Sequence, residues 1–211
     1  GNALIHMYGK CGCLDKAKEA FDTLPMQDIV SWNALIGGYV EHGLFEEALE
    51  FFERMQLLGI SPNVITFTCI LRACASIRAI EKGKKVHNEV LSRGFLEKDT
   101  ILGNALVVMY AKLGMLERAQ RVLEELHVRN LVSWSAMIAG YEQQGQDHEA
   151  VKCFEQMKCE GFSPDAITFV SLLKACDSVG AVGKGMEIHY VIMSKMLLED
   201  NIKLGNAFVD K

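Results

Sequence analysis

The sequence lacks the features that mark several large classes of protein. Its residues are 50% hydrophobic, yet no stretch approaches the roughly 20 consecutive apolar residues that a membrane-spanning helix needs. No signal peptide or Arg/Ser-rich transit segment stands at the start of the chain. No segment alternates apolar and polar residues over the length that predicts a β-sheet. We therefore expect no membrane span and an all-α chain in which every element is helix or turn.

Proline is also scarce, with 3 residues in the chain. A proline inside a helix removes a hydrogen bond and clashes with the preceding turn, so its positions help to locate helix ends. Pro25, Pro62 and Pro164 each follow an amphipathic run, and none interrupts one. The pattern predicts short helices that end in exits containing glycine or proline.

What the sequence does contain is a long internal repeat. The segment SWNALIGGYVEHG from Ser31 returns as SWSAMIAGYEQQG from Ser133, and GISPN from Gly59 returns as GFSPD from Gly161, a step of 102 residues in both cases. The same step links the opening GNAL to a second GNAL and to a GNAF near the end. A fixed period of this kind predicts a repeat architecture.

Each step contains three units of unequal length, each about the size of one helical hairpin. In a solenoid each unit packs on its neighbours, so we predict an α-solenoid of stacked helix-turn-helix repeats that forms a single array over residues 1–211. The chain begins and ends within a unit, and we expect its uncapped ends to favour self-association. The predicted units are 1–28 (partial), 29–63, 64–99, 100–130, 131–165, 166–200 and 201–211 (partial).

The unit 29–63 shows how each hairpin is built. Apolar residues recur every three or four positions, as on the buried face of an amphipathic helix. Gly38 and its copy Gly140 lie in the middle of the first helices, where glycine costs about 1 kcal/mol, so we predict a close helix crossing at both. The expected core positions are Trp32, Leu35, Ile36, Tyr39 and Val40 in the first helix and Phe45, Ala48, Leu49, Phe52 and Met55 in the second.

The chain has 7 cysteines, with no CxxC pair, and an odd number excludes a closed disulfide set. Apolar residues occupy the equivalent positions of the other copy, so we predict buried packing rather than metal binding. Unpaired cysteines also indicate a reducing compartment. The compared positions are Cys11 with Leu113, Cys13 with Met115, Cys153 with Phe51 and Cys159 with Leu57.

A row of non-core residues along each first helix is the candidate binding surface. Solenoids bind partners on the concave surface that one helix of each unit lines, and positions i, i+3 and i+7 share a helix face. The head of the row is β-branched: Val30, Ile65, Ile101, Val132, Ile167 and Ile202. Three residues further on, every unit but one, where Val170 stands, has a short polar residue: Asn2, Asn33, Thr68, Asn104, Ser135 and Asn206. Beyond these, four basic residues outnumber the single acid Glu41: Lys10, Arg72, Lys112 and Lys174.

This pattern suits a single-stranded nucleic acid. The apolar residue can pack on a base, the amide or hydroxyl can read the base edge, and the cation can meet a phosphate group. Reading one base per helical repeat is an established mode of RNA recognition. The alternative is that the short polar residues merely tolerate a solvated groove.

At these residues the whole chain resembles a pentatricopeptide repeat (PPR) protein, and specifically the plant organellar PLS subclass, in which P, long and short repeats alternate. The P-type repeats read VSWNALIGGYVEHGLFEEALEFFERMQLLGISPN and VSWSAMIAGYEQQGQDHEAVKCFEQMKCEGFSPD. The long repeats begin ITFTCILRAC and ITFVSLLKAC, and the short repeats contain NALIHMYGKCG and NALVVMYAKLG. The resemblance implies a right-handed superhelix that binds single-stranded RNA sequence-specifically.

In that family the fifth and last residues of a repeat specify one base, and the second residue sandwiches the base. The resemblance therefore implies that the six β-branched residues are base-sandwiching residues, and that RNA runs 5′ to 3′ from the N to the C terminus. Asn206 would be the reader of the last, partial repeat. The implied base-reading pairs are Asn2 with Asp28 (U), Asn33 with Asn63 (C or U), Thr68 with Asp99 (G), Asn104 with Asn130 (C or U), Ser135 with Asp165 (G) and Val170 with Asp200 (unassigned).

Members of this subclass direct C-to-U editing of chloroplast or mitochondrial transcripts and recruit small editing-factor proteins through their long repeats. The resemblance implies these partners and one of these organelles. An editing deaminase needs HxE and PCxxC motifs for its zinc site. His87 and Glu89 form an HxE, but its copy at His189 has Val191 in place of the glutamate, and no PCxxC occurs. We therefore predict a non-enzymatic adaptor with no metal and no cofactor, in which both histidines pack in second helices.

A different class of function also fits a groove lined by helices. A protein-binding α-solenoid scaffold of the tetratricopeptide type would share this architecture. The net charge of −5 and the pI of about 5.7 favour that alternative, because nucleic-acid-binding domains are usually basic. The leading prediction is the recognition part of an organellar C-to-U editing factor.

Overall fold

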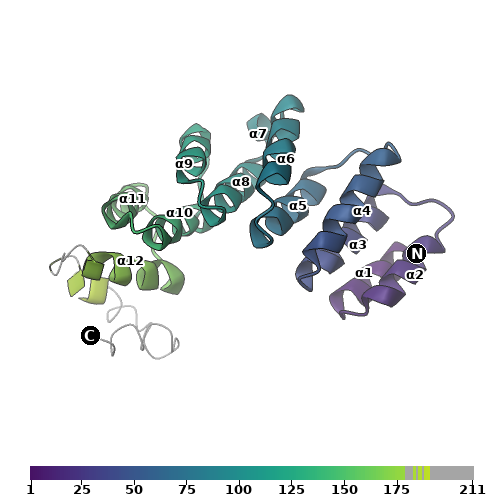
Figure 1. Ribbon diagram of the computed structural model, residues 1–211, viewed down its shortest axis with the longest axis horizontal. Helices are drawn as coiled ribbons and strands as arrows, with labels where there is room; N and C mark the ends of the chain where they lie inside the picture. Colours follow the sequence, from purple (N-terminus) through teal and green to yellow (C-terminus); the bar gives the residue numbers. More distant parts are fainter. Residues whose placement is uncertain (179–182, 184, 187, 191–211) are drawn as a thin grey trace. The chain divides into compact units, whose positions relative to one another are not determined.

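A computed structural model of the protein describes residues 1–178, 183, 185–186 and 188–190. Within these residues the chain forms helices and turns and no strand, which confirms the all-α prediction (Figure 1). The first helices of successive hairpins are α1 (Asn2–Lys10), α3 (Ile29–Glu41), α5 (Val64–Ser76), α8 (Thr100–Lys112), α10 (Leu131–Gln143) and α12 (Ala166–Ser178). The second helices are α2 (Leu14–Asp22), α4 (Phe45–Leu57), α6 (Ile80–Ser92), α9 (Leu116–Glu125) and α11 (Asp147–Cys159), and a short α7 (Phe95–Lys98) follows α6.

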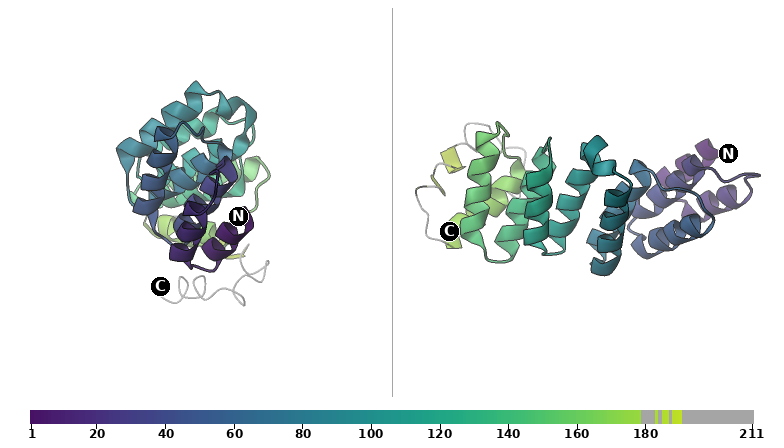
Figure 2. Two further views of the ribbon diagram at one scale, coloured as in Figure 1. Left: turned by 90° about the vertical axis from the view of Figure 1, so that its right-hand side faces the viewer. Right: turned by 90° about the horizontal axis from the view of Figure 1, so that it is seen from above.

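The helices group into two compact units, the N-terminal unit Gly1–Met109 and the C-terminal unit Tyr110–Lys211. In the N-terminal unit α3 packs on α1, α4 and α5, and α5 packs in turn on α6. In the C-terminal unit α10 packs on α9, α11 and α12. Within each unit, α1, α3, α5 and α10 therefore contact their own second helix and a neighbouring first helix, which is the stacking of an α-solenoid. Figure 2 shows α3 beside α4 from two further directions.

The predicted core of the hairpin 29–63 is confirmed at nearly every position. Every predicted core residue of this hairpin is buried except Phe45, which is half-buried. Aromatic rings join neighbouring helices: Phe21 meets Trp32 edge-on at 4.7 Å between ring centroids, and Tyr39 stacks on Phe51 at 5.2 Å. Each buried large side chain stabilises the fold by about 1.5–3 kcal/mol, so these contacts hold the hairpins in register.

The close helix crossings predicted at the mid-helix glycines are confirmed. A Cβ atom on Gly38 would lie 3.1 Å from the Cα atom of Gly9, so the α3 backbone touches the α1 backbone there. A Cβ atom on Gly140 would lie 2.7 Å from Cδ2 of Leu116. The absence of a side chain lets the first helices approach their neighbours closely, and this contact offsets the conformational cost of glycine in a helix.

The prediction that the compared cysteines are buried is right for Cys153 and wrong for Cys11, Cys13 and Cys159, which are exposed. Cys11 and Cys13 flank the turn between α1 and α2, and Cys159 is the last residue of α11. The reasoning failed because an apolar counterpart does not require burial: Leu57, the counterpart of Cys159, is 88% exposed.

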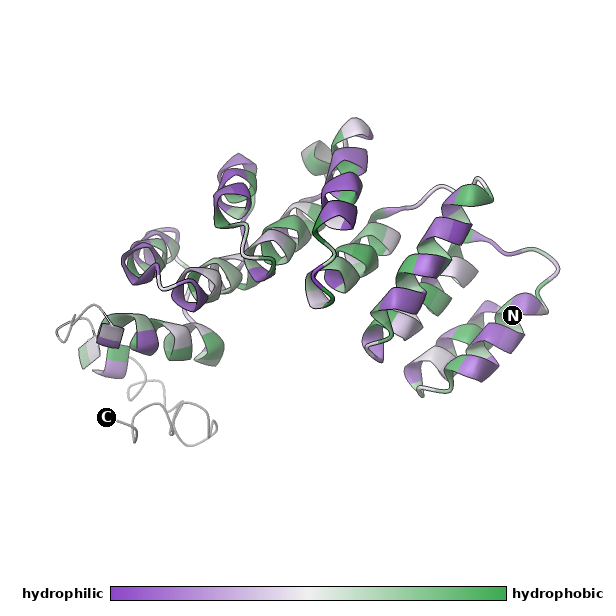
Figure 3. Ribbon diagram, in the orientation of Figure 1, coloured by the Kyte–Doolittle hydropathy of each residue, from purple (hydrophilic) through white to green (hydrophobic). Residues whose placement is uncertain are grey.

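Polar residues concentrate on the second helices. Figure 3 shows them along α6, α9 and α11, whereas α8 and α12 carry more apolar residues. The first helices are therefore the more deeply packed layer, and their remaining exposed face is the candidate binding surface.

Among the described residues no helix combines the length and apolarity that crossing a bilayer would demand.

Candidate nucleic-acid interface

The predicted base-sandwiching residues share one environment. Each stands in the first turn of a first helix and is exposed, although all are large apolar residues. Ile202 lies outside the described residues. The exposed fractions are 55% for Val30, 59% for Ile65, 59% for Ile101, 61% for Val132 and 65% for Ile167. A β-branched residue exposed at the same position of these five repeats is a ready apolar contact for a partner.

In the N-terminal unit Val30 and Ile65 open onto a groove of about 540 Å³ along α1, α3 and α5. The groove contains most of the predicted non-core rows of the first two repeats. A Cβ atom built on Gly37 would meet nothing within 4 Å, so the floor of the groove is open there. Residues that line it include Asn2, His6, Lys10, Val30, Asn33, Gly37, Glu41, Asn63 and Ile65.

Two of the predicted base-reading pairs meet through their side chains at this groove. Asn2 Nδ2 donates to the carboxylate of Asp28, at 3.2 Å from Oδ1. Asn33 Nδ2 donates to Oδ1 of Asn63 at 3.0 Å. These residues lie 26 and 30 positions apart in the chain, so only the hairpin fold brings each pair together. The pairs are half-buried or exposed and can be reached from solvent.

The last residue of four repeats has a second role that sequence reasoning missed, because it caps the following first helix. Its side-chain oxygen accepts from the backbone N–H three residues later, which satisfies a free donor of the helix N-terminus. The sequence signal was present as Asp or Asn followed by Ser or Thr three positions on. The distances are 2.8 Å for Asp28 and Ser31, 3.1 Å for Asn63 and Thr66, 2.9 Å for Asn130 and Ser133, and 2.8 Å for Asp165 and Thr168.

The cap changes the acidity of Asp28. The hydrogen bond from the Ser31 backbone N–H lowers the pKa of the Asp28 carboxyl below its ordinary value of 3.8, and the bond from Asn2 adds to this effect. Hydrogen bonds to the charged form favour that form. Asp28 therefore keeps its charge at the groove throughout the neutral range.

The other fifth-position residues differ from the expectation of an open row. Thr68 is half-buried and its hydroxyl donates to the Val64 carbonyl at 2.8 Å. Asn104 and Ser135 are buried, with 6% and 8% exposure. Short polar side chains can bond to the carbonyl four residues back in their own helix: Asn104 Nδ2 donates to Thr100 at 2.7 Å, and Ser135 Oγ to Leu131 at 2.8 Å. Val170 is half-buried, and Asp200 and Asn206 lie outside the described residues.

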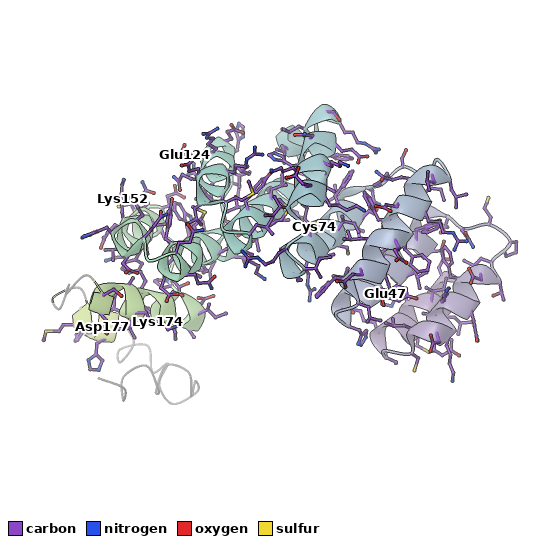
Figure 4. The ribbon with its side chains drawn as sticks, viewed as in Figure 1. Glu47, Cys74, Glu124, Lys152, Lys174 and Asp177 are labelled. Atoms are coloured by element: carbon purple, nitrogen blue, oxygen red, sulfur yellow. The ribbon has the colours of Figure 1, made fainter. Side chains whose placement is uncertain are left out.

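The predicted phosphate-contacting cations are all exposed, and two of them are paired with acids. Lys10 Nζ lies 2.5 Å from Oε1 of Glu41, and this hydrogen bond lowers the pKa of Glu41. Lys174 lies 3.9 Å from Glu142, an acid that the sequence analysis left out of the row. Figure 4 shows Lys174 on the first helix α12, with Glu124 and Lys152 on second helices of the same unit.

The described residues hold no group of three or more His, Cys, Asp or Glu side chains that could bind a metal ion. In the HxE sequence, Glu89 accepts hydrogen bonds from Gln56 Nε2 at 2.9 Å and from Arg93 at 2.5 Å. The Gln56 bond joins α6 to α4, the Arg93 bond lies at the end of α6 itself, and together they account for the glutamate structurally. His87 is half-buried, and the prediction that His189 packs in its helix is wrong, because that side chain is exposed.

Two family models match the chain. The model described as PPR repeat family matches residues 27–76 and 129–177, and the model described as PPR repeat matches residues 2–28, 65–95 and 104–131. Pentatricopeptide repeat-containing protein At2g33680 from Arabidopsis thaliana is 42% identical over 208 residues, which are 99% of this chain and 28% of that protein. Pentatricopeptide repeat-containing protein CRR2, chloroplastic, from the same plant is 41% identical over 189 residues, which are 88% of this chain and 28% of that protein.

Solved structures show the same fold at lower identity. The crystal structure of the pentatricopeptide repeat protein PPR10 from maize matches with a TM-score of 0.69 and 21% identity, over 98% of this chain and 30% of that one. The structure of PPR10 in complex with an 18-nt psaJ RNA element matches with a TM-score of 0.71 and 21% identity, over 89% of this chain and 29% of that one. The α-solenoid prediction is confirmed.

Proposed function

The chain belongs to the pentatricopeptide repeat family, and on that premise we propose that it binds single-stranded RNA along its first helices, one base per repeat. The observation that carries this proposal is the groove of the N-terminal unit. There an exposed Val30 or Ile65 stands next to the bonded pair Asn33–Asn63. An apolar contact for the face of a base and hydrogen-bonding groups for its edge are the parts that single-stranded RNA recognition needs.

The polar pairs can discriminate bases through the hydrogen-bonding capacity that they keep free. In the pair Asn33–Asn63, one Nδ2 hydrogen of Asn33 is used inside the protein, and an amide carries two. The second hydrogen and a carbonyl lone pair can bond an acceptor and a donor on the edge of a base, and the family resemblance assigns a pyrimidine, C or U, to this pair. For the other described pairs the assignments remain U at Asn2–Asp28, G at Thr68–Asp99, C or U at Asn104–Asn130 and G at Ser135–Asp165.

The finer identity follows from the alternation of three repeat types. We infer the PLS subclass, and hence the recognition part of an organellar C-to-U editing factor that acts as a non-enzymatic adaptor. A chloroplast or mitochondrial address is supported by relatives whose names carry "chloroplastic" or "chloroplastic/mitochondrial". The long repeats 64–99 and 166–200 would contact small editing-factor proteins.

A binding series tests the proposal against the protein-binding alternative, which the net charge of −5 favours. The 211-residue chain is titrated with short single-stranded RNAs that carry U-Y-G-Y-G in a fixed flank, with each position varied, at two salt concentrations. We expect base-dependent binding that weakens with salt and weakens again in Asn33→Ala. The matched control is Asn88→Ala, which truncates an exposed asparagine on the second helix α6. Absence of binding to every RNA would favour the protein-binding scaffold.

A further inference from the structure

Two equivalent threonines lie behind the base-reading pairs of the two P-type repeats. Thr66 on α5 and Thr168 on α12 are 0% and 1% exposed. Each is the third residue of a first helix, where its backbone N–H is capped by Asn63 or Asp165. Neither threonine is part of a row of non-core residues, and neither belongs to a base-reading pair. Burial of a hydroxyl is unfavourable unless the hydroxyl is hydrogen-bonded, so the partners of these side chains explain their position.

The hydroxyl of Thr66 reaches back to the preceding repeat. Thr66 Oγ1 donates to Oδ1 of Asn33 at 2.6 Å, and Asn33 Nδ2 donates to Oδ1 of Asn63 at 3.0 Å. The Asn33 amide is thus held at both ends, by a donor on one side and an acceptor on the other. These two contacts fix which end of the amide is oxygen and which is nitrogen. The atoms left for RNA are one N–H hydrogen and one carbonyl lone pair.

The hydroxyl of Thr168 makes the equivalent connection in the C-terminal unit. Its Oγ1 atom lies 2.6 Å from Oγ of Ser135 and 2.7 Å from Oδ1 of Asp165, while Ser135 Oγ lies 2.8 Å from the Leu131 carbonyl. Three short contacts share two hydroxyl hydrogens. The carboxylate is the strongest acceptor among these groups, so Thr168 donates to Asp165, and Ser135 donates to Thr168 or to Leu131. Either way Ser135 keeps only a lone pair to offer, which suits the N–H donors of guanine.

Serine at the same helix position behaves differently in the first helix after the repeat 1–28. Ser31 Oγ donates to the backbone carbonyl of Asp28 at 2.7 Å, within its own cap. Asn2, the reader that corresponds to Asn33, bonds to the Asp28 carboxylate instead. The link from a buried hydroxyl to the reader of the preceding repeat is therefore a property of the threonines and not of capping in general.

We propose that Thr66 and Thr168 are positioning residues for base selection, because their hydroxyls determine which hydrogen-bonding groups the preceding P-type repeat presents to RNA. This role rests on the proposed RNA-binding function and deepens it. The specificity of a P-type repeat is then set by three residues, one of which belongs to the next repeat and touches no RNA.

The first test replaces the hydroxyl and measures base preference at one nucleotide. In Thr66→Val the amide of Asn33 loses one of its two restraints, and we expect the preference for a pyrimidine opposite Asn33 to fall about threefold to tenfold, as expected for one lost hydrogen bond. Preferences at the other nucleotides should stay unchanged. Thr66→Ser keeps the hydroxyl and should retain the preference. The matched control Ser31→Ala also removes a capping hydroxyl and should leave the preference opposite Asn2 intact.

A second measurement needs no RNA. Thermal unfolding of Asn33→Ala, Thr66→Val and the double variant should give a double-variant loss in Tm smaller than the sum of the two single losses, because both remove the same contact. The cycle of Asn2→Ala with Ser31→Ala should be additive. Additive losses in the first cycle, or an unchanged pyrimidine preference in Thr66→Val, would overturn the positioning role alone. If the unaltered chain selected no base at any position, that result would instead overturn the proposed function and, with it, the positioning role.

Discussion

The two P-type repeats, residues 29–63 and 131–165, share a scaffold and differ at the reading pair. Both place a tryptophan in the core, a β-branched residue in the open and a capped helix after the repeat. Asn33 reaches across to Asn63 at the edge of the groove, whereas Ser135 is 8% exposed and bonded within the protein. The difference teaches that the fold of the repeat and its chemistry are set by separate residues.

The largest expected effect concerns the scaffold at Gly38 and Gly140. In Gly38→Ala the new methyl group would lie 3.1 Å from the Cα atom of Gly9, and backbone cannot move aside cheaply. We expect a loss of about 1–3 kcal/mol in the free energy of unfolding. Gly140→Ala meets the end of the Leu116 side chain, which can rotate, and the gain in helix propensity of about 1 kcal/mol should nearly cancel the cost.

Chemical denaturation followed by circular dichroism measures this contrast. Gly37→Ala is the control, since nothing lies within 4 Å of its added methyl group, and it should stabilise the chain by up to about 1 kcal/mol. Equal losses for Gly38→Ala and Gly140→Ala would show that the two crossings are equivalent.

The second-largest effect is expected when the base-reading residues of the two P-type repeats are exchanged. Asn33→Ser combined with Asn63→Asp gives the N-terminal unit the pair of the C-terminal unit and should shift the preferred base from a pyrimidine to G. Ser135→Asn should shift the preference at its own nucleotide from G toward U. Each shift should be about tenfold, the size of one or two hydrogen bonds. Competition binding with RNAs varied at one position reads out both, and an unchanged preference in either variant would contradict the assigned pairs.

A smaller effect compares the two ion pairs that hold predicted phosphate-contacting lysines, one in each unit. Lys10 is held by Glu41 at 2.5 Å, whereas Lys174 lies 3.9 Å from Glu142. Glu41→Gln should free Lys10 for a phosphate group, so that RNA binds a few-fold tighter and the salt dependence steepens by about 0.7 in log–log slope. Glu142→Gln should change both quantities less. Filter-binding titrations over a salt series measure the affinity and the salt dependence of both variants. Weaker RNA binding in Glu41→Gln would contradict the proposal that Lys10 contacts a phosphate group.

The smallest effect is the pH dependence of one helix cap. Asp28 caps α3 and its equivalent Asn130 caps α10, but only the carboxylate titrates. Because the folded-state pKa of Asp28 is lowered, its contribution is present above the unfolded pKa and is lost as pH falls through the folded value. The Tm advantage of the unaltered chain over Asp28→Asn should therefore shrink between pH 6 and pH 2. A constant difference across that range would mean that the charge of Asp28 adds nothing to the cap.

Much of the fold was predictable because it depends on local periodicity. Trp32, Leu35 and Ile36 recur at helical spacing, so their burial follows from sequence. The glycines in the middle of the first helices predicted the close helix crossings in the same way. The exposure of Cys11 and Cys13 was not predictable, because both belong to a turn where no periodic face exists. An apolar counterpart in the other copy carried no information about exposure there.

The candidate site divides along the same line. The amino-acid sequence by itself determined which residues stand at equivalent positions. Helix spacing places Val30, Ile65 and Ile101 on the same face of their respective helices, independently of the neighbouring helices. Only the tertiary structure decided which polar side chains remain accessible. Asn33 and Ser135 occupy the same position of the repeat, yet Asn33 lines the groove, whereas Ser135 is 8% exposed and bonded to Thr168. That outcome depends on a hydrogen bond between residues 33 positions apart, and spacing within a single helix contains no information about such a contact.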